Sequence, residues 1–191
     1  MPVAKRHILR VGDLKPAIAS SAFVGAGAVV VGDVTLSDHS SIWYGAVVRG
    51  DVAPVHIGPR TNIQDGTVIH VASASQPVSA TSRTPSEGYP TLIGDNVTVG
   101  HMVLLHACVI ENDAFVGMKS AVMDGAKIES GGMLAAGALL TAGKVVGRGQ
   151  LWAGSPAKFW RDLIDADKAQ FDLRANQYAQ LGQEYLKAPQ S

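Results

Sequence analysis

The sequence has a single cysteine, few charged residues and no net charge. Because Cys108 has no second cysteine to pair with, an intrachain disulfide is excluded, which favours a reducing compartment. Sixteen Lys and Arg balance sixteen Asp and Glu, so nothing indicates a nucleic-acid partner or a polybasic membrane patch. Uncharged stretches such as residues 130–143 are glycine-rich and too short to span a bilayer, so we expect no membrane insertion.

The basic N-terminal stretch MPVAKRHILR lacks the apolar segment of a secretory signal. We therefore expect a cytoplasmic protein, with the mitochondrial matrix as the alternative if the stretch is the remnant of an organellar presequence. Hydrophobic residues make up 47% of the 191, which is enough for one sizeable core.

A repeat of six residues runs through most of the chain. Its units include VGAGAV, VVGDVT, LSDHSS and IWYGAV, and later IENDAF, VGMKSA, VMDGAK and IESGGM. Each opens with Val, Ile or Leu, and the fifth place holds a small residue or valine. A period of six fits short strands joined by tight turns, three strands to a coil. This predicts an all-β solenoid, a parallel β-helix of hexapeptide repeats with roughly six coils stacked about 4.8 Å apart.

Two segments interrupt the repeat. Residues 71–91 are rich in Ser, Thr and Pro, so we expect a loop extruded from the coil. The unit LHACV, residues 105–109, has five residues instead of six. The pattern ends near LWAGSPAK, which predicts a β-helix over residues 1–156 and a helical tail over residues 157–191.

The tail contains the segment DADKAQFDLRANQYAQLGQEYL, which has helical periodicity with Asp165 as the expected N-cap. Phe171, Tyr178, Leu181 and Tyr185 fall on one side of this helix. We expect that side to pack against the coil or a neighbouring subunit.

The repeat also places polar residues in columns along the stack. If the loop adds no side to the coil, Ile69 and Leu105 open units on the same side, one coil apart. His70 and His106 directly follow them, so their backbones should lie about 5 Å apart in one outward column, where they can share a metal ion. Arg49 occupies the same column one coil earlier.

His101 and Asp65 stand two places after their unit openers, on the preceding side of the coil. His101 therefore lies around a corner from His70 and His106, where one chain cannot easily bring all three imidazoles to one ion. Three chains around a threefold axis could build such a site between subunits. Three neutral imidazoles suit Zn²⁺, and iron or cobalt would accept the same donors.

Other residues have simpler interpretations. We expect His7, His39 and His56 to be solvent-facing or stacked residues, and Cys108, at an inward place for small residues, to belong to the core. Ser155 in AGSPAK has no histidine that the pattern places beside it, so we interpret this segment as the exit from the coil and not as a nucleophile turn.

Several segments resemble the γ-class carbonic anhydrases: SSIWYGAVVRGD, TNIQDGTVIH, PTLIGDNVTVGH, LLHACVIENDAFVGM and LWAGSPAKFWRDL. The likeness is greatest to bacterial γ-carbonic-anhydrase-like proteins and to the γ-carbonic anhydrase subunits of mitochondrial complex I. It implies a left-handed coil and a homotrimer, with zinc bound by His70 and His106 of one subunit and His101 of the next. It also implies reversible hydration of CO₂ to bicarbonate by metal-bound hydroxide.

The resemblance further implies catalytic roles for residues near the metal. Asn62, Gln64 and Asp65 in TNIQDG match residues that surround the metal-bound water, and Gln64 would orient hydroxide or bicarbonate. Asp65 would pair with Arg49 across the subunit interface, and Asp51 would belong to the same network. Alternatively, Arg49 and Asp51 form only a salt-bridge network that specifies the trimer.

The sequence departs from the archaeal prototype of the family at two places. Val52 stands where that enzyme has a glutamate, and the loop at 71–91 holds one acid, Glu87, so no proton shuttle is identified. Three functions stay open: an active zinc carbonic anhydrase, a weakly active or inactive scaffold subunit of the complex I type, and a hexapeptide acyltransferase or CoA thioesterase.

Overall fold

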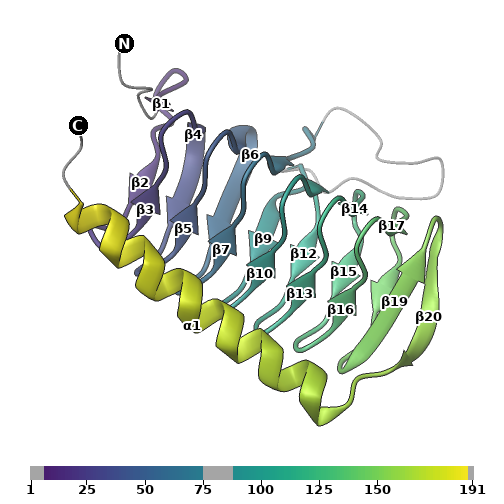
Figure 1. The fold of residues 1–191 in the computed structure, drawn as a ribbon. Coiled ribbons are helices and arrows are strands. Elements are labelled where there is room, and N and C mark those ends of the chain that lie inside the picture. The colour runs from purple at the N-terminus through teal and green to yellow at the C-terminus, as the bar shows by residue number, and fades with distance from the viewer. Residues whose placement is uncertain (1–6, 75–87, 189–191) are drawn as a thin grey trace.

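The computed structural model describes residues 7–74 and 88–188. Short strands wind into a left-handed parallel β-helix of about seven coils, and one helix follows them (Figure 1). The strands are β1 His7–Leu9, β2 Ala17–Ile18, β3 Phe23–Val24, β4 Val29–Leu36, β5 Ser41–Ile42, β6 Val47–Ile57, β7 Asn62–Ile63, β8 Val68–His70, β9 Thr91–Ile93, β10 Thr98–Val99, β11 Leu104–His106, β12 Val109–Ile110, β13 Phe115–Val116, β14 Ala121–Val122, β15 Lys127–Ile128, β16 Met133–Leu134, β17 Leu139–Leu140, β18 Val145–Val146, β19 Gln150–Gly154 and β20 Ala157–Asp162, and the helix is α1, Asp165–Lys187.

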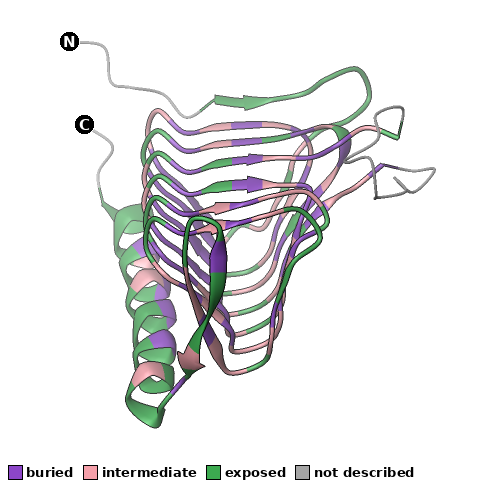
Figure 2. Cartoon of the chain, turned by 90° about the vertical axis from the view of Figure 1, so that its right-hand side faces the viewer, coloured by how far each residue is buried: buried purple, intermediate pink, exposed green. Residues whose placement is uncertain are grey.

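The coil is triangular in cross-section (Figure 2). Two sides belong to one hydrogen-bonded sheet, because the long strands β4 and β6 continue around the corner between them. We call these sides the histidine face, with β8, β11, β14 and β17, and the second face, with β2, β9, β12, β15 and β18. The third side, the helix face, contains β3, β5, β7, β10, β13, β16 and β19.

The residues that open the six-residue units form the core, as predicted. Ile63, Ile69 and Leu105 have no exposed surface, and small fifth-place residues such as Ala46 and Ala126 are equally buried. Counting units from VGAGAV predicts roughly six coils, whereas the structure has about seven, because the pattern already begins at Ile18 in β2.

The C-terminal part differs from the predicted helical tail over 157–191. Its first residues form β20, which pairs with β19 in antiparallel orientation, so α1 begins only at Asp165. The N-cap is Ile164, not Asp165, because the Ile164 backbone is extended and its N–H donates to Oδ2 of Asp167 at 3.0 Å. A side chain from within the first turn therefore caps the helix.

Helix α1 lies along the helix face (Figure 1), with Phe171, Ala175 and Gly182 buried against the coil. Phe171 stacks on Phe115 with ring centroids 5.2 Å apart. Leu181 remains 37% exposed in this single chain, so its packing against the coil or a neighbouring subunit stays a prediction. Successive residues of an α-helix are about 100° apart around its axis, so Leu181 lies to one side of the row formed by the buried residues of α1.

The predicted loop leaves and re-enters the coil at one corner. Strand β8 ends at His70, Ala72 forms an antiparallel bridge with Tyr89, and β9 begins at Thr91. The middle of the loop, residues 75–87 with Glu87, lies outside the described residues. Within the described ranges, no helix combines the length and apolar character needed to cross a membrane.

Candidate metal centre

His70 and His106 lie side by side on the histidine face, as the six-residue repeat predicts. They are paired in the register between β8 and β11, directly after the buried pair Ile69 and Leu105. Nδ1 of His70 is 3.2 Å from Nε2 of His106, and both rings are partly buried. The stacking of coils thus fixes the spacing between the two imidazoles.

A carboxylate holds the other nitrogen of each ring. Oδ1 of Asp51 lies 3.0 Å from Nε2 of His70, and Oδ1 of Asp124 lies 2.6 Å from Nδ1 of His106. Because an ionised carboxylate can only accept hydrogen bonds, each histidine donates from that nitrogen and keeps a lone pair on the other. The two lone pairs face each other.

This arrangement fits a bound cation. Two facing lone pairs at 3.2 Å repel unless a proton or a metal ion lies between them. Two nitrogens bound to one tetrahedral zinc at about 2.0–2.1 Å would be about 3.3–3.4 Å apart. The observed separation is close to that value, and a carboxylate behind each ring is usual for metal-bound histidines.

The predicted residues Arg49 and Asp51 extend this cluster. Nη1 of Arg49 is 2.5 Å from Oδ2 of Asp51, whose other oxygen contacts His70. Burial raises the pKa of Asp51, but the hydrogen bonds from Arg49 and His70 outweigh it and leave the pKa lowered. Burial, together with the nearby Arg49 charge, lowers the pKa of His70 and favours the neutral ring that a metal requires.

His101 lies apart from this pair, at the corner between the helix face and the histidine face. Its Nδ1 is 2.9 Å from Oδ2 of Asp65, and its side chain is 37% exposed; within the described part of the chain, Nε2 has no hydrogen-bond partner. Among the described residues, no three His, Cys, Asp or Glu side chains are placed to hold one metal ion. Within one chain, Asp65 pairs with His101 and Arg49 with Asp51, so the Arg49–Asp65 pair stays a prediction for an interface.

Asn62 and Gln64 lie under α1, on a different side of the coil from the histidine pair. Nε2 of Gln64 donates to Oδ1 of Asn62 at 3.0 Å, and Nδ2 of Asn62 donates to Oγ1 of Thr98 at 3.0 Å. Both residues are buried. Gln64 lines the same hollow as His101, whereas strand β7 belongs to a different sheet from the strands that carry His70 and His106.

A hollow of about 190 Å³ lies between Gln64 and helix α1. Gln64 and His101 share it with Arg174 and Tyr178 of the helix, and its other lining residues are Thr98, Gly100, Phe115, Gly117, Met118, Met133 and Ala136. The sequence did not indicate Arg174 or Tyr178 for this site, because α1 is far from His101 along the chain.

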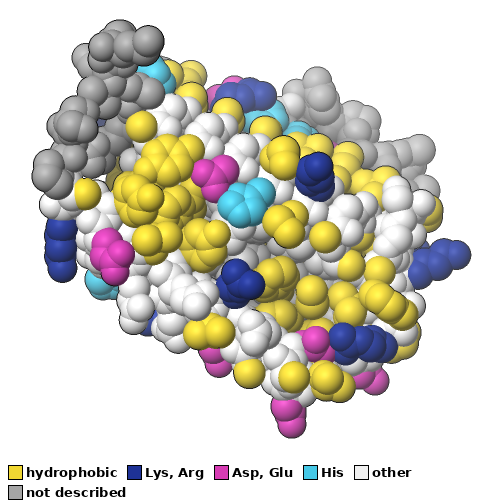
Figure 3. Space-filling model, in the orientation of Figure 1, with side chains coloured by type: hydrophobic (Ala, Val, Ile, Leu, Met, Phe, Trp, Pro, Cys, Tyr) yellow, Lys and Arg dark blue, Asp and Glu magenta, His cyan; other side chains and the backbone are white. Residues whose placement is uncertain are grey.

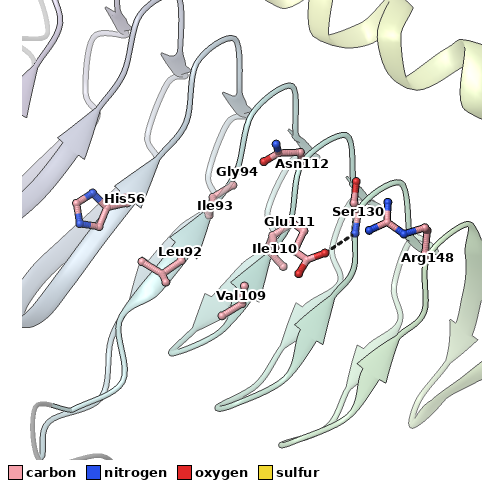
Figure 4. A pocket seen from close by; sticks show the side chains of 10 residues that line it. All are labelled: His56, Leu92, Ile93, Gly94, Val109, Ile110, Glu111, Asn112, Ser130 and Arg148. Atoms are coloured by element: carbon pink, nitrogen blue, oxygen red, sulfur yellow. Dashed lines mark hydrogen bonds between the residues drawn. The ribbon is translucent and has the colours of Figure 1, made fainter.

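A larger hollow of about 460 Å³ lies on the second face (Figure 4). It contains His56, Glu111 and Arg148 over an apolar floor that includes Leu92, and Glu111 accepts a hydrogen bond from the backbone of Ser130 at 2.9 Å. His70, His101 and His106 do not line this hollow. It is therefore not the predicted metal centre, although it is larger than the hollow beside His101.

The remaining histidines and the cysteine lie as predicted. His7, His39 and His56 are exposed. Cys108 is 1% exposed and packs in the core, and burial raises the pKa of its thiol far above the ordinary value. Asp124 is the site residue that sequence reasoning missed, since the Asp-Gly pair in VMDGAK resembles an ordinary turn.

No family model matches the chain, but several curated proteins do. The chain is 45% identical over 174 residues to YrdA of Escherichia coli, covering 91% of each protein. It is 41% identical to a carbonic anhydrase of Geobacillus kaustophilus, covering 92% of this chain and 88% of that one. The chain belongs to the γ-class carbonic anhydrase family. Gamma carbonic anhydrase 1, a mitochondrial protein of Arabidopsis thaliana, is 42% identical over 93% of the chain, which spans 62% of that relative's length.

Solved structures extend the family likeness to hexapeptide-repeat proteins. A hexapeptide transferase family protein from Anaplasma phagocytophilum is 42% identical, with a TM-score of 0.84 over 94% of this chain and 98% of that one. A candidate acetyltransferase from Bacillus cereus is 39% identical, with a TM-score of 0.85 over 95% and 97% of the two chains.

Proposed function

We propose that the protein is a zinc-dependent carbonic anhydrase that converts CO₂ and water reversibly into bicarbonate and a proton. Its metal sites would form between subunits of a homotrimer, each with His70 and His106 of one subunit and His101 of the next. Iron or cobalt would suit the same three nitrogens. The observation that carries the proposal is the facing pair of imidazole lone pairs at 3.2 Å, each backed by a carboxylate.

The incomplete ligand set supports sites between subunits. One chain offers two nitrogens on the histidine face, and the third histidine faces outward from a neighbouring corner. A structural or catalytic zinc takes three or four protein ligands, so a second chain must supply the remainder.

Exposed apolar side chains support the same assembly. Val68 and Leu104 on the histidine face, Met102 directly after His101, and Met118, which lines the same hollow as His101, are 39–54% exposed. Figure 3 shows hydrophobic side chains gathered around a histidine on one side of the molecule. Such patches next to functional polar groups are typical of subunit contacts.

A bound zinc ion lowers the pKa of a water ligand to about 7 and so supplies hydroxide near neutral pH. The chain's own residues have distinct tasks around it. Asp51 and Asp124 keep the protons of His70 and His106 on the nitrogens that face away from the metal. Gln64, held by Asn62, would orient hydroxide or bicarbonate from the side of His101. Arg49 and Asp51 would join Asp65 in a network across the interface.

The proposal is tested by zinc analysis and stopped-flow CO₂ hydration of the wild type, His106→Ala and His56→Ala. We expect the wild type to contain zinc and hydrate CO₂, and His106→Ala to lose both. His56→Ala removes an exposed histidine from the second face and should change neither. A His106→Ala protein with full zinc would show that the ligand assignment is wrong.

Two other functions remain as alternatives. A zinc-loaded trimer without CO₂ hydration would indicate a scaffold, such as the predicted complex I subunit. An acyltransferase or a CoA thioesterase is favoured only by the transferase names of the two structural relatives. Acyl transfer or thioester hydrolysis by a zinc-free protein would support it.

Location and partners are proposals of the same kind. YrdA comes from a bacterium, which suits the cytoplasm, whereas the Arabidopsis relatives are named mitochondrial, which suits the matrix. Association with respiratory complex I would follow only in the second case.

A further inference from the structure

We infer that Asp124 is a positioning residue, which orients His106 so that Nε2 of the ring is presented to the metal ion. This inference rests on the proposed zinc site. Asp124 lies outside the segments that resemble the γ-class carbonic anhydrases. The inference assigns it a task although it does not itself contact the metal.

The contact between Asp124 and His106 is short and directional. Oδ1 of Asp124 is 2.6 Å from Nδ1 of His106, and the carboxylate is only 17% exposed. Among the described residues, Asp124 has no other ion-pair partner. Because the carboxylate accepts the Nδ1 proton, the tautomer of His106 is fixed with its lone pair on Nε2, which faces His70.

The turn that carries Asp124 does not itself require an acid. One coil later, the same corner has Ala142 in place of Asp124, because Val122 is paired with Leu140. Both turns close with the same backbone hydrogen bond, at 3.0 and 3.1 Å, and both have a glycine with φ near +67° as the next residue. Alanine therefore fits this backbone, so the carboxylate contributes its hydrogen bond to His106 and little to the turn.

The position along the chain also suits this role. Leu105 is paired with Val122 in the next coil, and Asp124 follows Val122 by two residues, so the backbone of that coil holds the carboxylate against the ring of His106. The ligand and the group that orients it thus come from adjacent coils, and neither depends on a flexible loop. Loss of such an orienting group typically weakens metal binding about 10- to 100-fold.

The test measures zinc affinity by chelator competition on the full-length protein. Asp124→Ala should weaken zinc binding about 10- to 100-fold, and Asp124→Asn should weaken it less because its amide oxygen still accepts a hydrogen bond. The matched control is Asp113→Asn, which removes a charge from another coil corner, where Asp113 accepts a hydrogen bond from Asn96. Its zinc affinity should equal that of the wild type.

Two further readouts separate positioning from a structural role. The metal-free Asp124→Ala protein should keep the thermal midpoint and subunit stoichiometry of the wild type. Its cobalt-substituted form should have an altered visible spectrum, because one ligand is no longer held in orientation. An unchanged zinc affinity, or a loss that follows unfolding or dissociation, overturns the role of Asp124 and leaves the proposed function standing. A wild type that binds no zinc overturns both.

Discussion

Division of the ligands between subunits predicts that two inactive variants restore each other. His101→Ala keeps the facing pair His70 and His106 but lacks the third ligand, and His106→Ala keeps His101 but breaks the pair. Each variant alone has no complete site. In a mixed trimer, a site is complete wherever a His101→Ala subunit supplies the pair and the next subunit supplies His101.

The size of the effect follows from the ring. Any trimer that contains both variants has one position where a His101→Ala subunit is followed by a His106→Ala subunit, whatever the ratio. Mixed trimers should therefore have about one third of the wild-type zinc and CO₂ hydration. This fraction depends on the observation that one described chain holds two of the three histidines close together and the third apart.

The assay uses co-expressed variants with two different affinity tags and purification through both tags, followed by zinc analysis and stopped-flow kinetics. Each variant expressed alone with both tags is the control. Mixed trimers with no more zinc than the single variants would refute a site shared between subunits. Full zinc in either single variant would show that its histidine is not a ligand.

Three further predictions concern the fold. Leu105→Ala removes a side chain with no exposed surface, so the free energy of unfolding measured with denaturant should fall by about 2–5 kcal/mol. Leu173→Ala, at an exposed place on α1, should leave it nearly unchanged. The hydrogen bond from Arg161 holds the pKa of Asp167 below its ordinary value of 3.8, so its stabilisation is present above that pH and lost as the pH falls through the lowered value. The thermal midpoints of the wild type and Asp167→Asn should therefore converge in acid, and a constant difference would contradict this. Cys108 should resist thiol reagents in the native protein and react after unfolding, whereas rapid native reaction would contradict its burial.

The period of six was sufficient to predict the solenoid and the histidine column. A repeat with one inward aliphatic residue per unit fixes which residues share a column, so the pairing of His70 with His106 followed from counting. The same counting placed His101 with Asp65 at another corner. These predictions succeeded because each coil contacts only its neighbours, which keeps register a local property.

Contacts between columns could not be predicted in this way. Asp124 looked like a turn residue because an acid before glycine is common at such corners, and its contact with His106 depends on the side-chain direction. Tyr178 and Arg174 join the hollow beside His101 only because of how α1 lies along the coil. Strand β20 occupies the start of the predicted helical tail because it pairs with β19. The six-residue repeat carries no information about that pairing.

The closed base of the loop after β8 has an evolutionary consequence. The two histidines of the pair are 36 residues apart, although register pairs in the later coils, such as Val122 with Leu140, are separated by only 18. The excess lies in the segment that leaves after His70 and returns at Thr91, closed by the bridge between Ala72 and Tyr89. Residues can therefore be gained or lost there without moving either ligand. Relatives of this chain should differ freely in that interval while the histidines stay in the same column, so a search that requires a constant spacing between them would overlook true homologues.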